Sequence, residues 1–268
     1  MTGIKKILFR VLGLKNYLRV LHKSFHFLYA GNFLKKNNTY KYHYFDQRII
    51  QKGDVIIDIG ANLGYYTALF AKWTGETGKV YAVEPVVPFY ETIKWGTKRY
   101  NNIVTYNCAL GEEEKEIILA TPDHFGYLRT GLPHVIDQSS AAEKDYEFVF
   151  RAKMKKASVL FGDLPKIDFI KCDIEGYEEY VLPEMEHLID RHKPIIQVET
   201  WGDHKSKLEH FLFSAGYEAY DVENNCLKPA NEVRAGELGD LLFIHKDNNA
   251  AVFSRLGIPY PGKKREGD

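Results

Sequence analysis

Acidic residues are missing from the start of this sequence. No Asp or Glu occurs before Asp46, whereas nine Lys and Arg residues do. The rest of the chain holds 27 basic and 36 acidic residues, so a formal net charge of zero conceals a basic arm joined to an acidic body. Nucleic-acid phosphates require a basic surface, which only the arm could provide. Because the body is acidic, we expect no nucleic-acid partner.

Cysteines and long hydrophobic runs are also scarce. Cys108, Cys172 and Cys226 form no CxxC pair and no metal-ligand spacing, so nothing indicates a disulfide framework or a zinc site. No apolar run reaches the length of a transmembrane helix. No small-residue cleavage site follows the first apolar residues, so we expect this segment to be retained and the protein to be cytoplasmic.

Residues 1–45 are expected to form a basic amphipathic helical arm. Apolar residues recur at steps of three and four from Ile4 to Leu28, which is the spacing of one helix face. Two interpretations remain open. The arm packs against the body or a partner with its basic face solvated, or it lies peripherally on an anionic membrane surface, on the inner face of the cell membrane.

From residue 46 to about 248, apolar strand-like segments alternate with helical ones. Nearly continuous apolar runs such as DVIIDIG indicate a doubly wound α/β fold, in which helices cover both faces of a parallel sheet. Residues 111–163 break the alternation and are expected to form an insertion over the ligand-binding edge. Residues 249–268 are expected to form a tail. Helices are predicted near residues 65–72, 88–100, 178–191 and 205–215.

The stretch VIIDIGANLGYYT places a glycine-rich turn between a strand and a helix. Gly60 and Gly64 permit positive φ and close ligand approach, and Asn62 is the residue next best able to adopt left-handed backbone. No Gly-Lys-Ser/Thr follows, so the turn is not a P-loop. The dinucleotide fingerprint is incomplete, and Asp58 within the strand would repel a pyrophosphate but suit a cationic ligand.

Two later strand ends are expected at the same edge. Glu84 ends the segment YAVEP about 20 residues beyond the turn, where a carboxylate accepts hydrogen bonds from ribose hydroxyls. In YNCALG, Asn107, Ala109 and Leu110 are candidates to flank an adenine through backbone groups and apolar contact. These positions predict a nucleoside-containing ligand.

Ionisable residues alternate with apolar ones in FIKCDIEG. Because alternate residues of a strand share a face, Lys171, Asp173 and Glu175 are expected together, with Glu199 from the neighbouring strand. Buried unpaired charges would be costly, so these groups are expected at the cleft, paired with one another. They could accept a hydroxyl proton, brace the cleft as an ion-pair cluster or bind a metal ion, and the spacing does not identify a metal.

Residues in and beyond the insertion supply further candidates. Three histidines are rival bases because imidazole titrates near neutrality, and two aromatic residues and an arginine are candidate contacts for a sugar or an anion. A surface or packing role is open for each of these residues: His124, Tyr127, Arg129, His134, Trp201 and His204.

The segments DIGANLGYYT, VEP, NCALG, IDFIKCDIEGYE and PIIQVE, in this order and spacing, resemble the FkbM family of S-adenosylmethionine-dependent methyltransferases. The resemblance implies the class I methyltransferase fold, a Rossmann-like seven-stranded sheet with its last strand antiparallel. It also implies cofactor contacts at Asp58, Gly60, Asn62, Gly64 and Glu84. Members of the family commonly have a Leu-Asp pair before the fourth strand. The corresponding segment here reads FGDL, and this departure leaves any role of Asp163 in doubt.

The resemblance implies methyl transfer to oxygen, with S-adenosylhomocysteine as the second product. The acceptor implied is a sugar hydroxyl of a glycan, polysaccharide or glycolipid precursor, and a lipid-linked glycan would suit an arm that meets the membrane. Three alternatives stay open: an N-methyltransferase, a nicotinamide-dependent oxidoreductase and a binding module without catalysis. The oligomeric state is not indicated.

Overall fold

The centre of the protein is a twisted sheet of eight strands. The computed structural model describes residues 2–121, 126–131, 133–136, 146–200, 204–230 and 239–260, with the side chains at positions 2, 204 and 205 outside this description. In chain order the strands of the sheet are β1 (Val55–Ile59), β2 (Lys79–Val83), β3 (Ile103–Tyr106), β8 (Phe169–Cys172), β9 (Ile195–Thr200), β10 (Tyr217–Glu223), β11 (Cys226–Pro229) and β12 (Gly239–His245).

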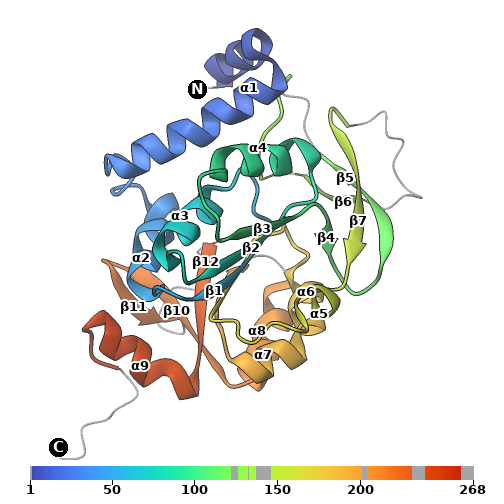
Figure 1. Ribbon diagram of the computed structural model, residues 1–268. Helices are drawn as coiled ribbons and strands as arrows, with labels where there is room; N and C mark the ends of the chain where they lie inside the picture. Colours follow the sequence, from blue (N-terminus) through green and yellow to red (C-terminus); the bar gives the residue numbers. More distant parts are fainter. Residues whose placement is uncertain are drawn as a thin grey trace, which may run out of the picture.

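The strand order is β11-β10-β12-β9-β8-β1-β2-β3 (Figure 1). Strands β1, β2, β3, β8 and β9 are mutually parallel, and β12 lies antiparallel between β9 and β10. This is the expected class I arrangement of seven strands with the last one antiparallel. The eighth strand, β11, forms a hairpin with β10 through Asn224 and Asn225, both at positive φ, which suits a two-residue hairpin turn.

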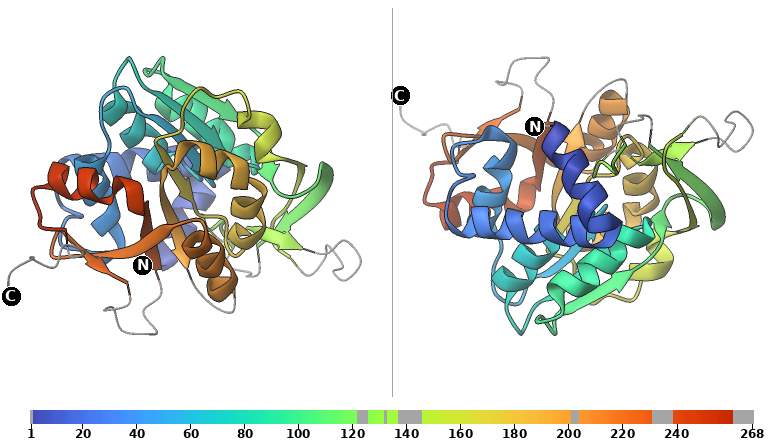
Figure 2. Two further views of the ribbon diagram at one scale, coloured as in Figure 1. Left: turned by 90° about the horizontal axis from the view of Figure 1, so that it is seen from below. Right: turned by 90° about the horizontal axis from the view of Figure 1, so that it is seen from above.

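Helices cover both faces of this sheet (Figure 2). On one face, Ile56 and Phe169 pack among residues of α2 (Lys41–Ile49), α3 (Tyr65–Thr74) and α9 (Lys246–Leu256). On the other face, Ile57 and Ile170 pack among residues of α5 (Ala157–Phe161), α6 (Glu178–Glu184), α7 (Glu186–His192) and α8 (His204–Ser214). The alternation along β1 and β8 confirms that the central strands are buried on both faces.

Two expectations about helices need correction. The helix predicted over residues 178–191 is two helices, α6 and α7, because Pro183 has no N–H to continue the hydrogen-bond ladder and the backbone leaves helical geometry at Met185. Residues 249–256 are not part of a tail. They belong to α9, whose Val252 and Phe253 are buried in the core.

The N-terminal arm is divided by Gly13. Helix α1 (Thr2–Ala30) is interrupted there by a non-helical backbone with φ 67°, and the two halves point in different directions (Figure 2). After Gly13, Tyr17 and Leu18 are buried and α1 packs on α4 (Val87–Thr97). No helix in the described parts of the chain has the length and apolarity to span a bilayer.

The expected boundary of the arm at residue 45 falls inside a helix. A short 3-10 turn, η1 (Asn38–Tyr40), leads into α2, and Phe45 and Ile49 of α2 are 0% and 1% exposed. The boundary is wrong because α2 presents apolar residues to the sheet, so residues 41–45 are part of the body's core rather than of a separate arm.

The insertion forms a second sheet, in the order β4-β7-β5-β6. Its strands are β4 (Ala109–Leu110), β5 (Lys115–Ala120), β6 (His134–Ile136) and β7 (Val149–Lys155). It lies between β3 and β8 in the sequence, as expected, and stands beside the carboxyl ends of the central strands (Figure 1). The insertion begins earlier than expected because β4 pairs with β7, and α5, expected within it, packs against the body.

Substitution of Phe45 tests the assignment of α2 to the core. We expect Phe45→Ala to lower the free energy of unfolding by about 3–5 kcal/mol, because it leaves a cavity where a fully buried ring was. Phe33→Ala is the matched control: Phe33 is 69% exposed, and its loss should change stability by less than about 0.5 kcal/mol. Urea unfolding measures both, and equal effects would contradict the assignment.

Candidate active site

The glycine-rich turn brings the ends of β1 and β8 into close contact. Gly60 has φ 76°, and a Cβ there would overlap the carbonyl oxygen of Asp173. Asn62 also has positive φ, at 52°, and Gly64 precedes α3 with φ 77°. The turn therefore uses left-handed backbone at each of the three positions predicted for it, and only glycine fits at the first.

Asp58 lies behind this turn rather than in the open pocket. Its side chain is 1% exposed, and its Oδ2 accepts a hydrogen bond of 2.5 Å from the hydroxyl of Thr67 at the start of α3. Burial raises the pKa of Asp58 to about 6, although Lys171 on the neighbouring strand opposes the shift. Its other oxygen, Oδ1, has no partner among the described residues and can receive a donor from a ligand at the turn.

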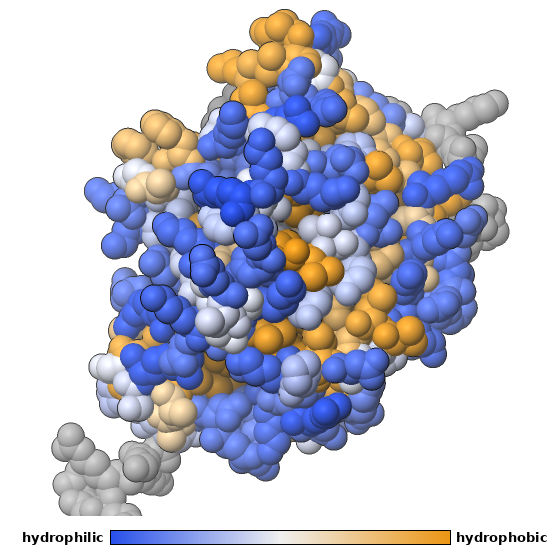
Figure 3. Space-filling view, in the orientation of Figure 1, coloured by the Kyte–Doolittle hydropathy of each residue, from blue (hydrophilic) through white to orange (hydrophobic). Residues whose placement is uncertain are grey.

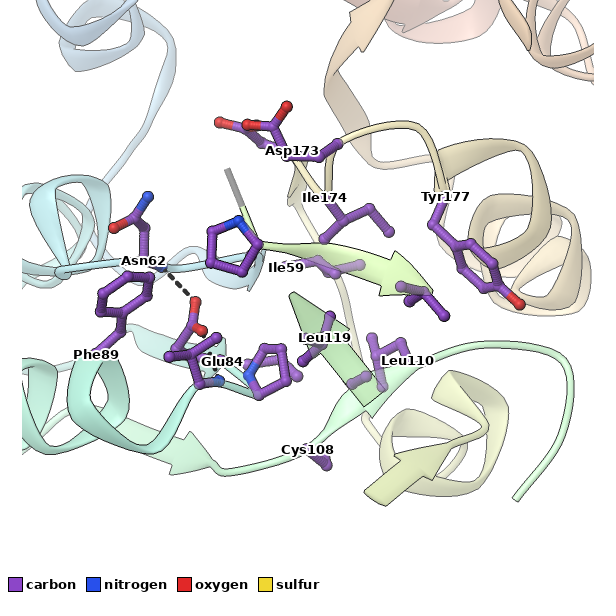
Figure 4. A pocket seen from close by; sticks show the side chains of 18 of the residues that line it. Ile59, Asn62, Glu84, Phe89, Cys108, Leu110, Leu119, Asp173, Ile174 and Tyr177 are labelled. Carbon is purple, nitrogen blue, oxygen red and sulfur yellow. Dashed lines mark hydrogen bonds between the residues drawn. The ribbon is translucent and has the colours of Figure 1, made fainter. Parts of the chain in front are cut away.

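Glu84 connects the turn to the start of α4. The backbone N–H of Asn62 donates to its Oε2 and that of Val86 to its Oε1, both at 2.8 Å (Figure 4). Burial raises the pKa of Glu84 to about 8, while the two N–H groups oppose the shift. Each oxygen keeps a further lone pair, so this carboxylate can still accept hydrogen bonds from the two hydroxyls of a ribose.

A hollow of about 800 Å³, counted with its open mouth, runs from Glu84 to Tyr177. Figure 4 shows polar groups at the Glu84 and Asp173 ends and apolar side chains between them. The apolar lining comes from both sheets, from α4 and from the segment before β4, and includes Ile59, Val83, Phe89, Cys108, Ala109, Leu110, Leu119 and Val135. A flat apolar ring fits the middle of such a hollow, with a polar sugar at one end.

Asn107 does not line this hollow. Its Nδ2 donates to the backbone carbonyls of Glu84 at 2.9 Å and Pro85 at 3.0 Å, so it braces the end of β2. Cys108, which sequence reasoning passed over as a buried cysteine, occupies the lining instead. Ala109 and Leu110 line the hollow, and their contact with an adenine stays a prediction.

Three carboxylates converge at the opposite end. Carboxylate oxygens of Asp173, Glu175 and Glu199 lie within 4.8 Å of one another. Glu175 reaches this position because its backbone adopts φ 58° and the following Gly176 φ 96°. The group can hold a divalent cation or a proton.

Two members of this group, Glu175 and Glu199, have pKa values raised toward neutrality by partial burial and by neighbouring carboxylates. Partial burial and the neighbouring Asp173 raise the pKa of Glu175 to about 7. Burial, Asp173 and Glu175 together raise the pKa of Glu199 to about 8. A carboxylate with such a pKa is a far better proton acceptor than an ordinary one.

Lys171 is buried next to the three carboxylates and forms an ion pair with one of them. It is 3% exposed, its Nζ forms an ion pair of 2.7 Å with Asp173, and it lies 4.8 Å from the centre of the Tyr66 ring. Burial alone would lower its pKa, but Asp173, Asp240 and Asp58 outweigh burial and the pKa is raised. Lys171 is therefore a fixed positive charge beneath the cleft and does not line the hollow.

A buried polar network behind Lys171 was missed by sequence reasoning. Gln197 donates from Nε2 to the Tyr66 hydroxyl at 3.1 Å and to the carboxylate of Asp240. Burial raises the pKa of Asp240, while Lys171 opposes this shift. The only sequence signal was a lone Asp at the start of the apolar segment GDLLFIH. Its role depends on β12 inserting antiparallel beside β9.

Asp46 extends this network to the N-terminal region. Its side chain is 0% exposed, and neither carboxylate oxygen has a hydrogen-bond partner within the described ranges. Burial and then Asp240 raise its pKa well above the ordinary value. Nearby, the ring of His43 stacks on Tyr66 at 3.8 Å, so α2 contributes polar residues directly beneath the site.

The predicted substrate residues are scattered. Tyr127 is buried against Tyr17 in a core cluster and does not line the hollow, and Arg129 is exposed. His134 lines a second groove that adjoins the hollow at Glu175 and Tyr177.

His124 and Trp201 lie outside the described residues, as does the side chain of His204. Asp163 is exposed and away from the hollow.

Gly60→Ala tests whether the turn must touch β8. We expect loss of S-adenosylhomocysteine binding, because the new Cβ would push the Asp173 backbone out of place. Gly257→Ala is the matched control, since Gly257 shares the positive φ but a Cβ there meets nothing within 4 Å. It should cost only the backbone strain of about 1–2 kcal/mol and leave ligand affinity intact. Calorimetry measures the affinities, and full binding by Gly60→Ala would contradict the role of this contact.

Solved structures with the same fold are similar to this chain at low identity. A methyltransferase FkbM from Methylobacillus flagellatus shares 18% identity with a TM-score of 0.48, covering 72% of this chain and 43% of that one. Aeropyrum pernix fibrillarin with natively bound S-adenosylmethionine shares 10% identity with a TM-score of 0.44, covering 73% and 68%. A putative rRNA methylase from Clostridium thermocellum shares 14% with a TM-score of 0.46, covering 78% and 96%.

This chain thus spans less than half the length of the Methylobacillus protein. No curated protein matches the chain.

A family model gives the decisive comparison. The methyltransferase FkbM domain matches residues 58–219, which is more than half of the chain. The match begins at Asp58 and includes the turn, Glu84, the second sheet and the three clustered carboxylates. The chain therefore belongs to the FkbM family of S-adenosylmethionine-dependent methyltransferases.

Proposed function

We propose that this protein transfers the methyl group of S-adenosylmethionine to a hydroxyl oxygen of a sugar, in a glycan, polysaccharide or glycolipid precursor. The observation that carries the proposal is the convergence of Asp173, Glu175 and Glu199 at one end of the hollow. A sugar hydroxyl is a poor nucleophile at neutral pH, and carboxylates with raised pKa values are suited to accept its proton.

The other end of the hollow fits the cofactor. Glu84 would accept hydrogen bonds from the ribose hydroxyls, and Ala109 and Leu110 would flank the adenine. Gly60 and Asn62 line the hollow beside Glu84, and Asp58 Oδ1, which has no hydrogen-bond partner among the described residues, lies behind the turn. When bound, the cofactor supplies an electrophilic methyl group on a sulfonium, and the roles of these residues are to hold and orient it.

The chain's own part in the reaction is to place and deprotonate the acceptor. As the hydroxyl oxygen forms its bond to the methyl carbon, the carbon–sulfur bond breaks and the hydroxyl proton passes to a carboxylate of the cluster. Asp173 is the first candidate for this base or for positioning the hydroxyl, because Lys171 fixes it at 2.7 Å. Glu175 and Glu199 can hydrogen-bond the acceptor from either side.

A groove beside the cluster is suited to the acceptor. It shares Glu175 and Tyr177 with the hollow and continues past Lys115, Glu116 and His134 of the second sheet. An aromatic face next to charged and imidazole groups is typical of sugar-binding surfaces. The same carboxylates would also attract an amine, so N-methylation is the alternative. An acceptor carried on a lipid would place the reaction at a membrane surface.

Asp173→Asn tests the role of the cluster. We expect it to abolish methyl transfer while S-adenosylhomocysteine affinity stays within a few-fold, because the substitution removes the charge that would accept the proton and leaves the Asp173 backbone beside Gly60 in place. In a strain lacking the gene, mass spectrometry of cell-envelope glycans should show the loss of one methyl ether. The wild-type gene should restore this group and Asp173→Asn should not.

Glu113→Gln is the control for that complementation, because Glu113 is an exposed carboxylate next to the second sheet. It should restore the methyl group in full. Restoration by Asp173→Asn would refute the role of this carboxylate, and a missing N-methyl group in place of an ether would favour the amine alternative.

The pH profile of methyl transfer tests the raised pKa values. If Glu175 or Glu199 accepts the proton, that carboxylate must be deprotonated, so activity should rise as pH increases through their pKa values of about 7 to 8 and not near pH 4. Glu199→Gln removes one negative neighbour and should move the rise to lower pH. Loss of activity in EDTA and recovery with Mg²⁺ would instead assign the cluster to a cation.

A further inference from the structure

The first half of α1 presents an apolar stripe to solvent. Ile4, Ile7 and Val11 are 67%, 63% and 76% exposed, and Leu8 is 36% exposed. These positions are spaced by three and four residues, so their side chains lie in one row along the helix. Figure 3 shows the resulting hydrophobic patch at the top of the molecule, over the N-terminal end of α1.

This half of the helix is held in place by its other face. The ring of Phe9 packs edge-on against Tyr17 at 5.4 Å and against Phe148 of the insertion at 6.1 Å. Leu12 packs against the same buried cluster. The stripe is therefore the face left over after packing, and the fold orients it away from the body.

Positive charge borders the stripe. Lys5 and Arg10 are exposed and, by helical geometry, fall on opposite flanks of it. No acidic residue occurs anywhere before Asp46. A second copy of this chain would bring the same positive charges against one another, so self-association through this face is disfavoured. An apolar row with basic flanks and no acidic residue suits a bilayer surface that contains anionic lipid.

We propose that the first half of α1 docks this protein on the surface of an anionic membrane. The helix lies parallel to the bilayer, with Ile4, Ile7 and Val11 inserted between headgroups and Lys5 and Arg10 in contact with lipid phosphates. This goes beyond the proposed reaction and does not depend on which acceptor is methylated.

Docking through this helix also sets the orientation of the site. Beyond Gly13, His22 donates from Nδ1 to the carbonyl oxygen of Leu63 in the cofactor turn at 2.7 Å. Tyr17 and Leu18 pack in the same cluster as Leu63 and as Phe89, which lines the hollow. The membrane-facing half is thus linked by buried contacts to the cofactor turn, and a docked molecule holds its cleft at a set distance from the lipid surface.

Vesicle co-sedimentation of the full chain tests this proposal. We expect the wild-type protein to sediment with vesicles of phosphatidylcholine and phosphatidylglycerol, to remain largely in solution with phosphatidylcholine alone and to be released by salt. Val11→Glu should lower the affinity for anionic vesicles by on the order of tenfold, because it adds a repelled charge to the inserted row. Lys5→Gln with Arg10→Gln should remove the preference for anionic lipid.

Val159→Glu is the matched control, because Val159 is a similarly exposed valine, at 67%, on α5, away from α1 in Figure 1. It should bind vesicles as the wild type does. The proposal is overturned if the wild type binds neither vesicle, or if the two glutamate variants bind alike. It is also overturned if Val11→Glu converts a dimer to a monomer without any vesicle binding. S-adenosylhomocysteine affinity, measured in parallel, separates these results from failure of the catalytic proposal.

Discussion

The buried ammonium of Lys171 is the group around which the site is arranged. A charge that is 3% exposed costs several kcal/mol unless partners compensate it. Asp173 provides the direct ion pair, and Asp58 and Asp240 add negative charge from the strands β1 and β12. One cation thus ties together the ends of strands that are far apart in the sequence.

The same arrangement explains why two carboxylates at the cleft have raised pKa values. Lys171 compensates Asp173, but Glu175 and Glu199 have no comparable cation in contact with them among the described ion pairs. Their pKa values rise toward neutrality because each is partly buried beside other carboxylates. Such groups bind a proton or a cation more readily than isolated surface carboxylates, and carboxylates with raised pKa values of this kind are common at functional sites.

Much of this could be predicted from the sequence. The turn at Gly60 and Gly64, the carboxylate Glu84 and the clustered Asp173 and Glu175 are local features, because they follow directly from strand ends and backbone conformation. The alternation of apolar strands and helices likewise predicted the parallel sheet and the position of the insertion. Asn107 and Tyr127 were different, because the same local sequence allows a polar or aromatic side chain either to face the ligand or to brace the fold.

Local sequence by itself determined most strands and helices of the central α/β unit, the positive φ of the glycine-rich turn, and that the N-terminal residues carry positive charge without acidic partners. Only the tertiary structure decided that Asp46 and Asp240 lie beneath Lys171, that α2 belongs to the core, and that Gly13 divides α1 into a packed and an exposed half. The reason is physical: conformational preferences act between neighbours in the chain, whereas burial and charge compensation depend on which distant elements share a face.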